Sequence, residues 1–203
     1  MEREDILYEI RRCLRIEADS VKKQQEEIDE EVILKVAETI QNCKGKIILS
    51  ACGTSAMAAK KIAHSLNCIE RPALFLTPSD AVHGGLGVVQ SEDVVILISK
   101  GGNTEELVRL LPACKIKKAT VIGVSENPDS KLAVNTDIYL KIKVEREPCR
   151  FNMLATASTM AVIAVFDAVC IALMQMTGYS REQFAVIHPG GAVGERLLNE
   201  EKS

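Results

Sequence analysis

Five short runs of aliphatic and β-branched residues constrain the fold more than any other feature of this sequence. They are KIILSA, ALFLT, DVVILIS, ATVIGVS and DIYLKIKV, which begin at Lys46, Ala73, Asp93, Ala119 and Asp137. Stretches typical of helices lie between them, at about 54–67, 79–85, 103–114 and 129–134. Continuous apolar strands that alternate with helices are typical of a parallel sheet covered on both faces. We therefore predict an α/β fold, a three-layer αβα sandwich.

The segments before and after these runs are also predicted to be helical. Apolar residues recur every three to four positions from Ile6 to Ile28, and a second amphipathic helix is expected at about 30–43. Such exposed amphipathic helices often pack on a partner subunit. The strongly apolar stretch 153–176 is interrupted by polar residues such as Asp167, which favours a buried core or interface helix over a membrane span. A short helix is expected near 180–186.

Composition narrows the class of protein. A chain of 203 residues, 47% of them apolar, fits one domain with a sizeable core. The net charge of -3 and the lack of a basic cluster argue against nucleic acid as a partner. The charged N-terminus lacks the apolar core of a signal peptide, so a cytoplasmic location is predicted. Seven cysteines and three histidines show no metal-ligand spacing, and we expect neither a metal nor a cofactor.

Three of the predicted strands end in serine and turn residues, in LSACGTS, LISKGGNT and GVSENPDS. In such a sheet, ligands bind beyond the carboxyl ends of the strands, where the winding reverses. The segments 53–55 and 99–104 each place glycine and hydroxyls before a helix, whose free N–H groups attract anions. Either loop alone could be an ordinary helix cap. Because the two strands are expected to be adjacent, we predict a phosphate site; neither loop matches GxxxxGK[ST] or GxGxxG, which argues against a nucleotide.

The order of several motifs carries a resemblance to a known family. CGTS, DAVHGGLG, ISKGGNTEEL, VEREPCRFNMLATASTMA and HPGGAVGERL together resemble the sugar isomerase (SIS) domain family, and within it the arabinose 5-phosphate isomerase branch. The resemblance implies a single SIS domain with N-terminal helices at 1–44 and a core at 45–198. It also implies a five-stranded flavodoxin-like sheet, a sugar phosphate ligand, and a homodimer or homotetramer. Members of that branch often continue into a pair of CBS domains, whereas this chain stops at Ser203, so a SIS-only form is expected.

The resemblance also implies which residues bind the phosphosugar. They lie in the two loops, at Gly53, Thr54, Ser55, Ser99, Lys100, Gly101, Asn103 and Thr104. Of these, Ser55, Ser99 and Thr104 match the family's phosphate-binding positions. Gly101 stands where the family usually has a second serine. Lys100 could supply a charge-assisted hydrogen bond in its place, or could point into solvent.

An aldose–ketose isomerase opens the sugar ring and moves a proton between C1 and C2 through an enediol, which requires a base near the carbons. Glu147 matches the family's Glu-x-Cys carboxylate and is the candidate base, although without that match the run KVERE would favour a charged surface. His83 and His188 are candidates for ring opening or proton relay. His188 could instead cap a helix that begins with Pro189. His64, inside a predicted helix, is expected to be a packing or surface residue.

Two departures from the arabinose 5-phosphate isomerases bear on activity. Thr54 stands where those enzymes carry lysine, and Asn103 where they carry glutamate. Together these changes could abolish the arabinose 5-phosphate reaction, because each removes a charged hydrogen-bonding group. Two hypotheses follow. The first is a phosphosugar aldose–ketose isomerase with altered active-site residues, and the alternative is a catalytically weak or inactive phosphosugar-binding sensor or regulatory protein.

Overall fold

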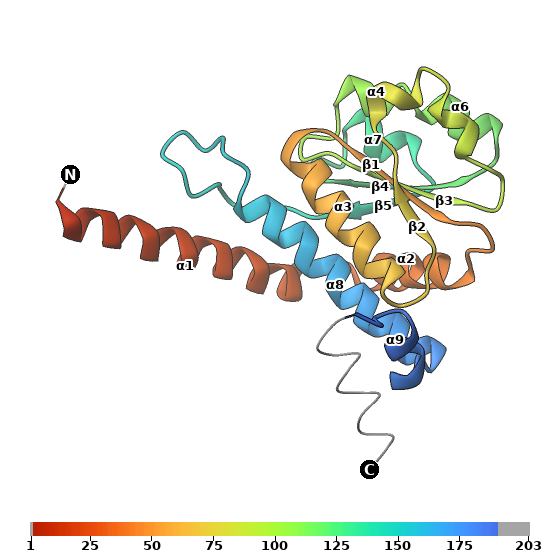
Figure 1. Ribbon diagram of the computed structural model, residues 1–203. Coiled ribbons are helices and arrows are strands. Elements are labelled where there is room, and N and C mark those ends of the chain that lie inside the picture. The colour runs from red at the N-terminus through yellow and green to blue at the C-terminus, as the bar shows by residue number, and fades with distance from the viewer. Residues whose placement is uncertain (1, 191–203) are drawn as a thin grey trace, which may run out of the picture.

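The computed structural model describes residues 2–190 and is built around one five-stranded sheet (Figure 1). The strands are β1 (Ile47–Ala51), β2 (Ala73–Phe75), β3 (Val94–Ile98), β4 (Thr120–Ser125) and β5 (Ile138–Lys141). All are parallel, in the order β2-β1-β3-β4-β5. This is the flavodoxin-like order, so the predicted fold class is confirmed. The end of the predicted core, 191–198, and with it most of HPGGAVGERL, lies outside the described residues.

Helices cover both faces of the sheet, which gives the three predicted layers (Figure 1). One face packs on α2 (Glu30–Asn42), α3 (Gly53–Asn67) and α8 (Ala157–Thr177). The other packs on α4 (Pro78–Ala81), α5 (Glu105–Val108), α6 (Leu111–Ile116) and α7 (Lys131–Asn135). A 3-10 helix, η1 (Gly85–Val88), follows α4. Ile47 and Leu49 pack in the apolar cluster on the first face, and Ile48 packs in the cluster on the second, because side chains alternate along a strand.

The two longest helices pack on each other. α1 (Arg3–Glu27) lies beside α8, and its N-terminal half extends beyond the sheet (Figure 1). Within the described part of the chain, α8 alone is long and apolar enough to cross a membrane, but core helices of soluble folds share that property. Phe166 and Leu173 of α8 are fully buried in the apolar cluster beneath the sheet. In this structure α8 therefore serves as a core helix.

The prediction of one continuous helix at 103–114 is wrong. The chain forms two short helices instead, because α5 ends at Val108 and α6 begins at Leu111. Pro112 lies in the first turn of α6. In a continuous helix its ring would clash with the carbonyl of Val108 and it would donate no hydrogen bond. The apolar helix predicted from 153 likewise begins only at Ala157.

Candidate active site

The two predicted phosphate loops meet at one edge of the sheet. β1 and β3 are neighbours, and Ala51 at the end of β1 pairs with Ile98 at the end of β3. The strand order reverses between them, which is where flavodoxin-like sheets bind ligands. The predicted adjacency of the two strands is confirmed.

The loop after β3 is held in a tight hydrogen-bonded turn. The hydroxyl oxygens of Ser99 and Thr104 lie 2.8 Å apart, and the Gly102 N–H donates to Ser99 Oγ at 3.1 Å. Only glycine fits at position 102, because φ is +71° and a Cβ would lie 2.1 Å from Ser130 Oγ. Two hydroxyls that share one hydrogen bond leave one O–H free to donate. This hydroxyl pair, Ser99 and Thr104, can therefore offer a hydrogen bond to an anion.

Asn103 and Gly101 of the same loop differ in what surrounds them. The Asn103 side chain accepts a hydrogen bond from the Lys131 N–H at 2.9 Å, which ties the loop to the start of α7. Position 101 opens onto free space, since a Cβ there would meet no atom within 4 Å. Asn103 thus has a structural contact of its own, and Gly101 leaves room for a ligand.

The loop after β1 leads directly into α3. Gly53 adopts a left-handed conformation with φ of +57°, which glycine accommodates without strain. The first backbone bond of the helix runs from the Ala56 N–H to the Cys52 carbonyl, so the N–H groups up to Ser55 precede it. Thr54 is exposed and Ser55 half-buried. These groups lie at the positive end of a long helix, which favours an anion.

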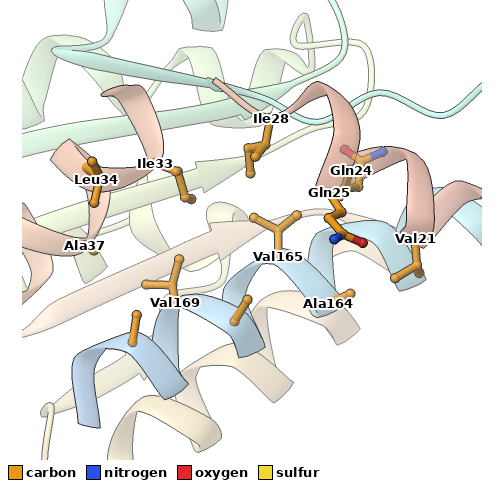
Figure 2. Close-up of a pocket in the computed structure, with 12 residues that line it drawn as sticks. Val21, Gln24, Gln25, Ile28, Ile33, Leu34, Ala37, Ala164, Val165 and Val169 are labelled. Atoms are coloured by element: carbon orange, nitrogen blue, oxygen red, sulfur yellow. The ribbon is translucent and has the colours of Figure 1, made fainter. Parts of the chain in front are cut away.

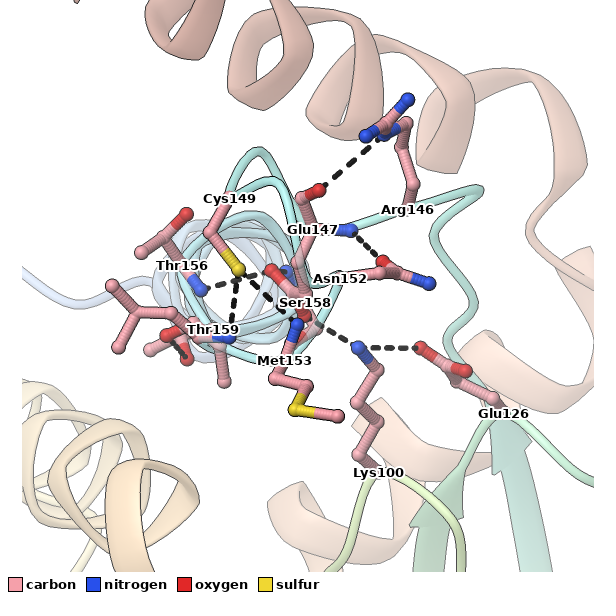
Figure 3. Close-up of polar contacts among 12 residues, drawn as sticks. Lys100, Glu126, Arg146, Glu147, Cys149, Asn152, Met153, Thr156, Ser158 and Thr159 are labelled. Carbon is pink, nitrogen blue, oxygen red and sulfur yellow. Dashed lines mark hydrogen bonds and ion pairs between the residues drawn. The ribbon is translucent and has the colours of Figure 1, made fainter.

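Glu147 is fully buried, and its carboxylate binds Lys100 (Figure 3). Lys100 Nζ lies 2.5 Å from Glu147 Oε1, and the Ser158 hydroxyl donates to the same oxygen. The Thr156 N–H donates to Oε2 at 2.9 Å, so the carboxylate also occupies the N-terminus of α8. Burial alone would raise the pKa of Glu147, but the bonds from Lys100, Ser158 and Thr156 outweigh it and lower the pKa. Glu147 is therefore ionised at neutral pH.

Comparison with known proteins identifies the family. Residues 39–172 match the SIS domain model, a segment that covers more than half of the chain. The chain belongs to the SIS domain family. It is 36% identical over 194 residues to arabinose 5-phosphate isomerase KdsD of Pseudomonas aeruginosa. It is 35% identical over 196 residues to arabinose 5-phosphate isomerase GutQ of Escherichia coli K12.

These alignments cover nearly all of this SIS chain but only part of its relatives. They span 96% and 97% of this chain, against 59% and 61% of the two relatives. The chain thus spans about 60% of the length of the curated relatives it matches. The predicted resemblance to the arabinose 5-phosphate isomerases is confirmed, and the SIS-only form stays a prediction.

Two solved structures support the SIS fold. One is a Listeria monocytogenes protein whose assignment as a sugar-phosphate isomerase is itself an inference. It is 58% identical, with a TM-score of 0.92 over 94% of this chain and 100% of that one. The other is an Escherichia coli CFT073 protein in complex with arabinose 5-phosphate, which is 30% identical, with a TM-score of 0.89 over 93% of this chain and 100% of that one.

Glu126 also lies beside Lys100, although it was not among the residues predicted from the sequence. It follows β4, and its Oε1 lies 4.0 Å from Lys100 Nζ. That oxygen is buried and has no hydrogen-bond partner among the described residues. Burial raises the pKa of Glu126, and nearby Lys100 only partly offsets this. An acidic residue directly after a strand, at the same edge as Lys100, is the signal that could have found it.

The structure does not bring His188 to this site within one chain. His83 is exposed in the turn after α4, and His64 lies on the surface of α3. His188 follows α9 (Arg181–Val186), where its ring stacks on Phe184 with 3.9 Å between centroids. The 21-residue helix α8 separates α9 from the bonds of Glu147, a length of about 30 Å. The structure therefore joins Ser99, Lys100, Thr104 and Glu147, but not His188.

Two other features of the described residues bear on ligands. An apolar groove of about 400 Å³ lies between α1, α2 and α8 (Figure 2). It is lined by residues that include Val21, Ile33, Leu34 and Val165. Within residues 2–190, no group of three or more histidine, cysteine or acidic side chains is arranged to hold a metal ion.

Proposed function

We propose that this protein is a phosphosugar aldose–ketose isomerase that works through an enediol. The observation that carries the proposal is the contact between Lys100 and the buried Glu147 at the carboxyl edge of the sheet, beside the Ser99–Thr104 hydroxyl pair. Membership of the SIS family and similarity to enzymes named arabinose 5-phosphate isomerases support a sugar phosphate as the class of substrate.

The phosphate group of the sugar is bound at the start of α3 and in the loop after β3. Ser55 and the hydroxyl pair supply side-chain donors, and the first N–H groups of α3 supply backbone donors. Gly53 and Gly101 let the ligand approach the backbone, because neither carries a side chain that would fill the space. Phosphate at a helix N-terminus is a favourable arrangement because the helix dipole stabilises negative charge.

Isomerisation then needs one base and one stabilised oxygen. Glu147 takes the proton from C2, and the electrons of that C–H bond form the C1–C2 double bond. The carbonyl oxygen gains negative charge, which the ammonium of Lys100 stabilises. The hydroxyl proton on O2 moves to O1, and Glu147 returns its proton to C1, so no oxidant or reductant is used. Before the first step, the sugar must displace Lys100 or Ser158 from Glu147 Oε1.

A homodimer or homotetramer is part of the proposal. His188 cannot reach Glu147 within one chain, so its proposed role in ring opening requires a second copy. Apolar side chains are available for such a contact, because Ile10 and Leu14 of α1 are 52% and 60% exposed and the groove in Figure 2 is apolar. The mass of the particle in solution, measured by light scattering, tests this directly. A monomer at micromolar concentration would contradict it.

The decisive experiment is a panel of pentose, hexose and hexosamine phosphates. Each is tested for binding by thermal shift and for turnover and exchange of the C2 proton by NMR. We expect at least one to be turned over by the parent and not by Glu147→Gln. Binding without exchange of the C2 proton in any member of the panel would overturn the isomerase and support the sensor, which the structural contact of Asn103 and the exposed Thr54 favour.

A further inference from the structure

Lys100 lies between two carboxylates that come from different parts of the chain (Figure 3). Lys100 follows β3, Glu126 follows β4, and Glu147 lies in the segment before α8. We call these three residues the lysine–carboxylate cluster. Lys100 is in contact with both carboxylates but can pair fully with only one of them at a time.

The two carboxylates differ in how well they are satisfied. Glu147 is bound by Lys100, Ser158 and the start of α8, whereas the buried Oε1 of Glu126 has no hydrogen-bond partner among the described residues. Leaving a buried acceptor unpaired is unfavourable, and few such groups persist in a folded protein without a role. The oxygen lies 4.0 Å from Lys100 Nζ, just beyond hydrogen-bond reach.

The backbone allows the lysine to move between them without moving the loops. The Glu126 N–H donates to the Lys100 carbonyl at 2.9 Å, which fixes the two main chains to each other. The Lys100 side chain is 37% exposed, and its long flexible stem can bring the ammonium into contact with either carboxylate.

We propose that Glu126 is a second anchor for Lys100, and that the lysine moves from Glu147 to Glu126 when the sugar phosphate binds. The move frees Glu147 to take the proton from C2 and keeps the ammonium beside the oxygen that gains charge. Glu126 is thus a positioning residue that acts through Lys100. This inference rests on the proposed isomerase function and adds a residue to it.

The electrostatics of the cluster fit this exchange. Burial raises the pKa of Glu126, and Glu147 adds to this; Lys100, a backbone hydrogen bond from Val144 and Lys143 lower it, but do not outweigh burial. The bonds to Glu147, by contrast, lower the pKa of that carboxyl despite its burial. Two carboxyl groups whose pKa values are pushed apart are typical of acid–base sites.

A double-mutant cycle tests the proposal on whichever sugar phosphate the parent turns over. Glu126→Gln keeps the shape of the side chain but cannot bind the ammonium as an ion pair, so kcat should fall about 10²-fold while KM stays within about threefold. In a Lys100→Met background, Glu126→Gln should cause no further loss, because Glu126 acts only through the lysine. The control is Glu145→Gln, which removes an exposed carboxylate and should match the parent.

The pH dependence of kcat/KM is a second test, because it reports the free enzyme and requires no variant of Lys100. The parent should lose kcat/KM as pH falls through the raised pKa of Glu126, because the protonated carboxyl no longer attracts Lys100. This loss should begin above 4.5, the ordinary value of a glutamate, and should move to lower pH in Glu126→Gln.

The outcomes separate the two proposals. If the parent turns over a sugar phosphate and Glu126→Gln does so equally well, the second anchor is wrong and the isomerase stands. A rise in KM with unchanged kcat would also overturn it, because Glu126 would then bind substrate rather than position Lys100. If the parent turns over no member of the panel, the isomerase itself is wrong and this inference falls with it.

Discussion

Lysine contacts a buried carboxylate at both ends of the sheet, and the two sites differ in how many carboxylates the lysine contacts. At the amino ends, Lys46 precedes β1 and Asp93 precedes β3, with Lys46 Nζ 2.9 Å from Asp93 Oδ2. The Lys46 and Gln90 N–H groups donate to the same carboxylate at 2.9 and 2.7 Å. One cation therefore faces one anion, and both carboxylate oxygens are bound. At the carboxyl ends, one lysine faces two carboxylates and one oxygen is left unpaired.

This difference separates a structural site from a reactive one. The balanced pair holds two strands together, and both of its carboxylate oxygens already accept hydrogen bonds. The lysine–carboxylate cluster contains a buried acceptor without a hydrogen bond, Glu126 Oε1. Such an acceptor lowers the stability of the fold, but it can accept a bond when a ligand displaces Lys100 from Glu147. It also lies where loops rather than strands meet, at the point at which the strand order reverses.

The largest expected effect on stability is at the balanced pair. Asp93→Asn leaves Lys46 without its buried partner, and breaking such a pair costs about 3 to 5 kcal/mol of unfolding free energy. Urea unfolding measures the loss, and kcat per folded molecule should equal that of the parent. If Asp93→Asn instead reduced kcat while stability held, the two ends of the sheet would not differ in role.

At the carboxyl edge, removing a hydroxyl should affect binding instead. Thr104→Val keeps the shape of the side chain but removes one member of the hydroxyl pair. Losing a hydrogen bond to a charged phosphate costs about 1.5 to 3 kcal/mol, which calorimetry would record as a weaker Kd. Thr177→Val at the far end of α8 is the matched control. Equal binding by both variants would place the phosphate elsewhere.

Much of this architecture could be predicted from the sequence. The five strand runs and the adjacency of the two phosphate loops follow from local apolar patterns and the rules for parallel sheets. The Lys100–Glu147 contact could not be predicted, because it joins residues 47 positions apart and depends on where α8 begins. The unpaired oxygen of Glu126 could not be predicted from the sequence pattern either, because the burial of one atom depends on how the whole structure packs.

Acid should affect the balanced pair in a definite direction. Burial alone would raise the pKa of Asp93, but hydrogen bonds from Lys46 and Gln90 outweigh it and lower the pKa below the ordinary 3.8. A carboxyl with a lowered pKa stabilises the fold above its unfolded pKa and loses that contribution as pH falls through the folded value. Unfolding midpoints below pH 3.8 should therefore fall more steeply in the parent than in Asp93→Asn. If the unfolding midpoints of the parent and of Asp93→Asn fell in parallel with pH, Asp93 would not be the source of the loss of stability in acid.

The smallest effect is expected from restoring the family's usual serine at position 101. Gly101→Ser should change the unfolding free energy by less than about 1 kcal/mol, because its Cβ meets open space and φ is not left-handed. Gly102→Ala is the contrast, since its Cβ would lie 2.1 Å from Ser130 Oγ. Similar melting temperatures for the two variants would contradict the described turn.

The most direct test of the difference between the two ends is the exchange of the substrate C2 proton with deuterated water in two matched variants. Lys46→Met and Lys100→Met each remove one lysine from a buried carboxylate, one at each end of the sheet. We expect Lys46→Met to exchange the proton as fast as the parent per folded molecule, although it unfolds earlier, and Lys100→Met to lose exchange by about 10²-fold or more. Equal exchange by the two variants would contradict the account.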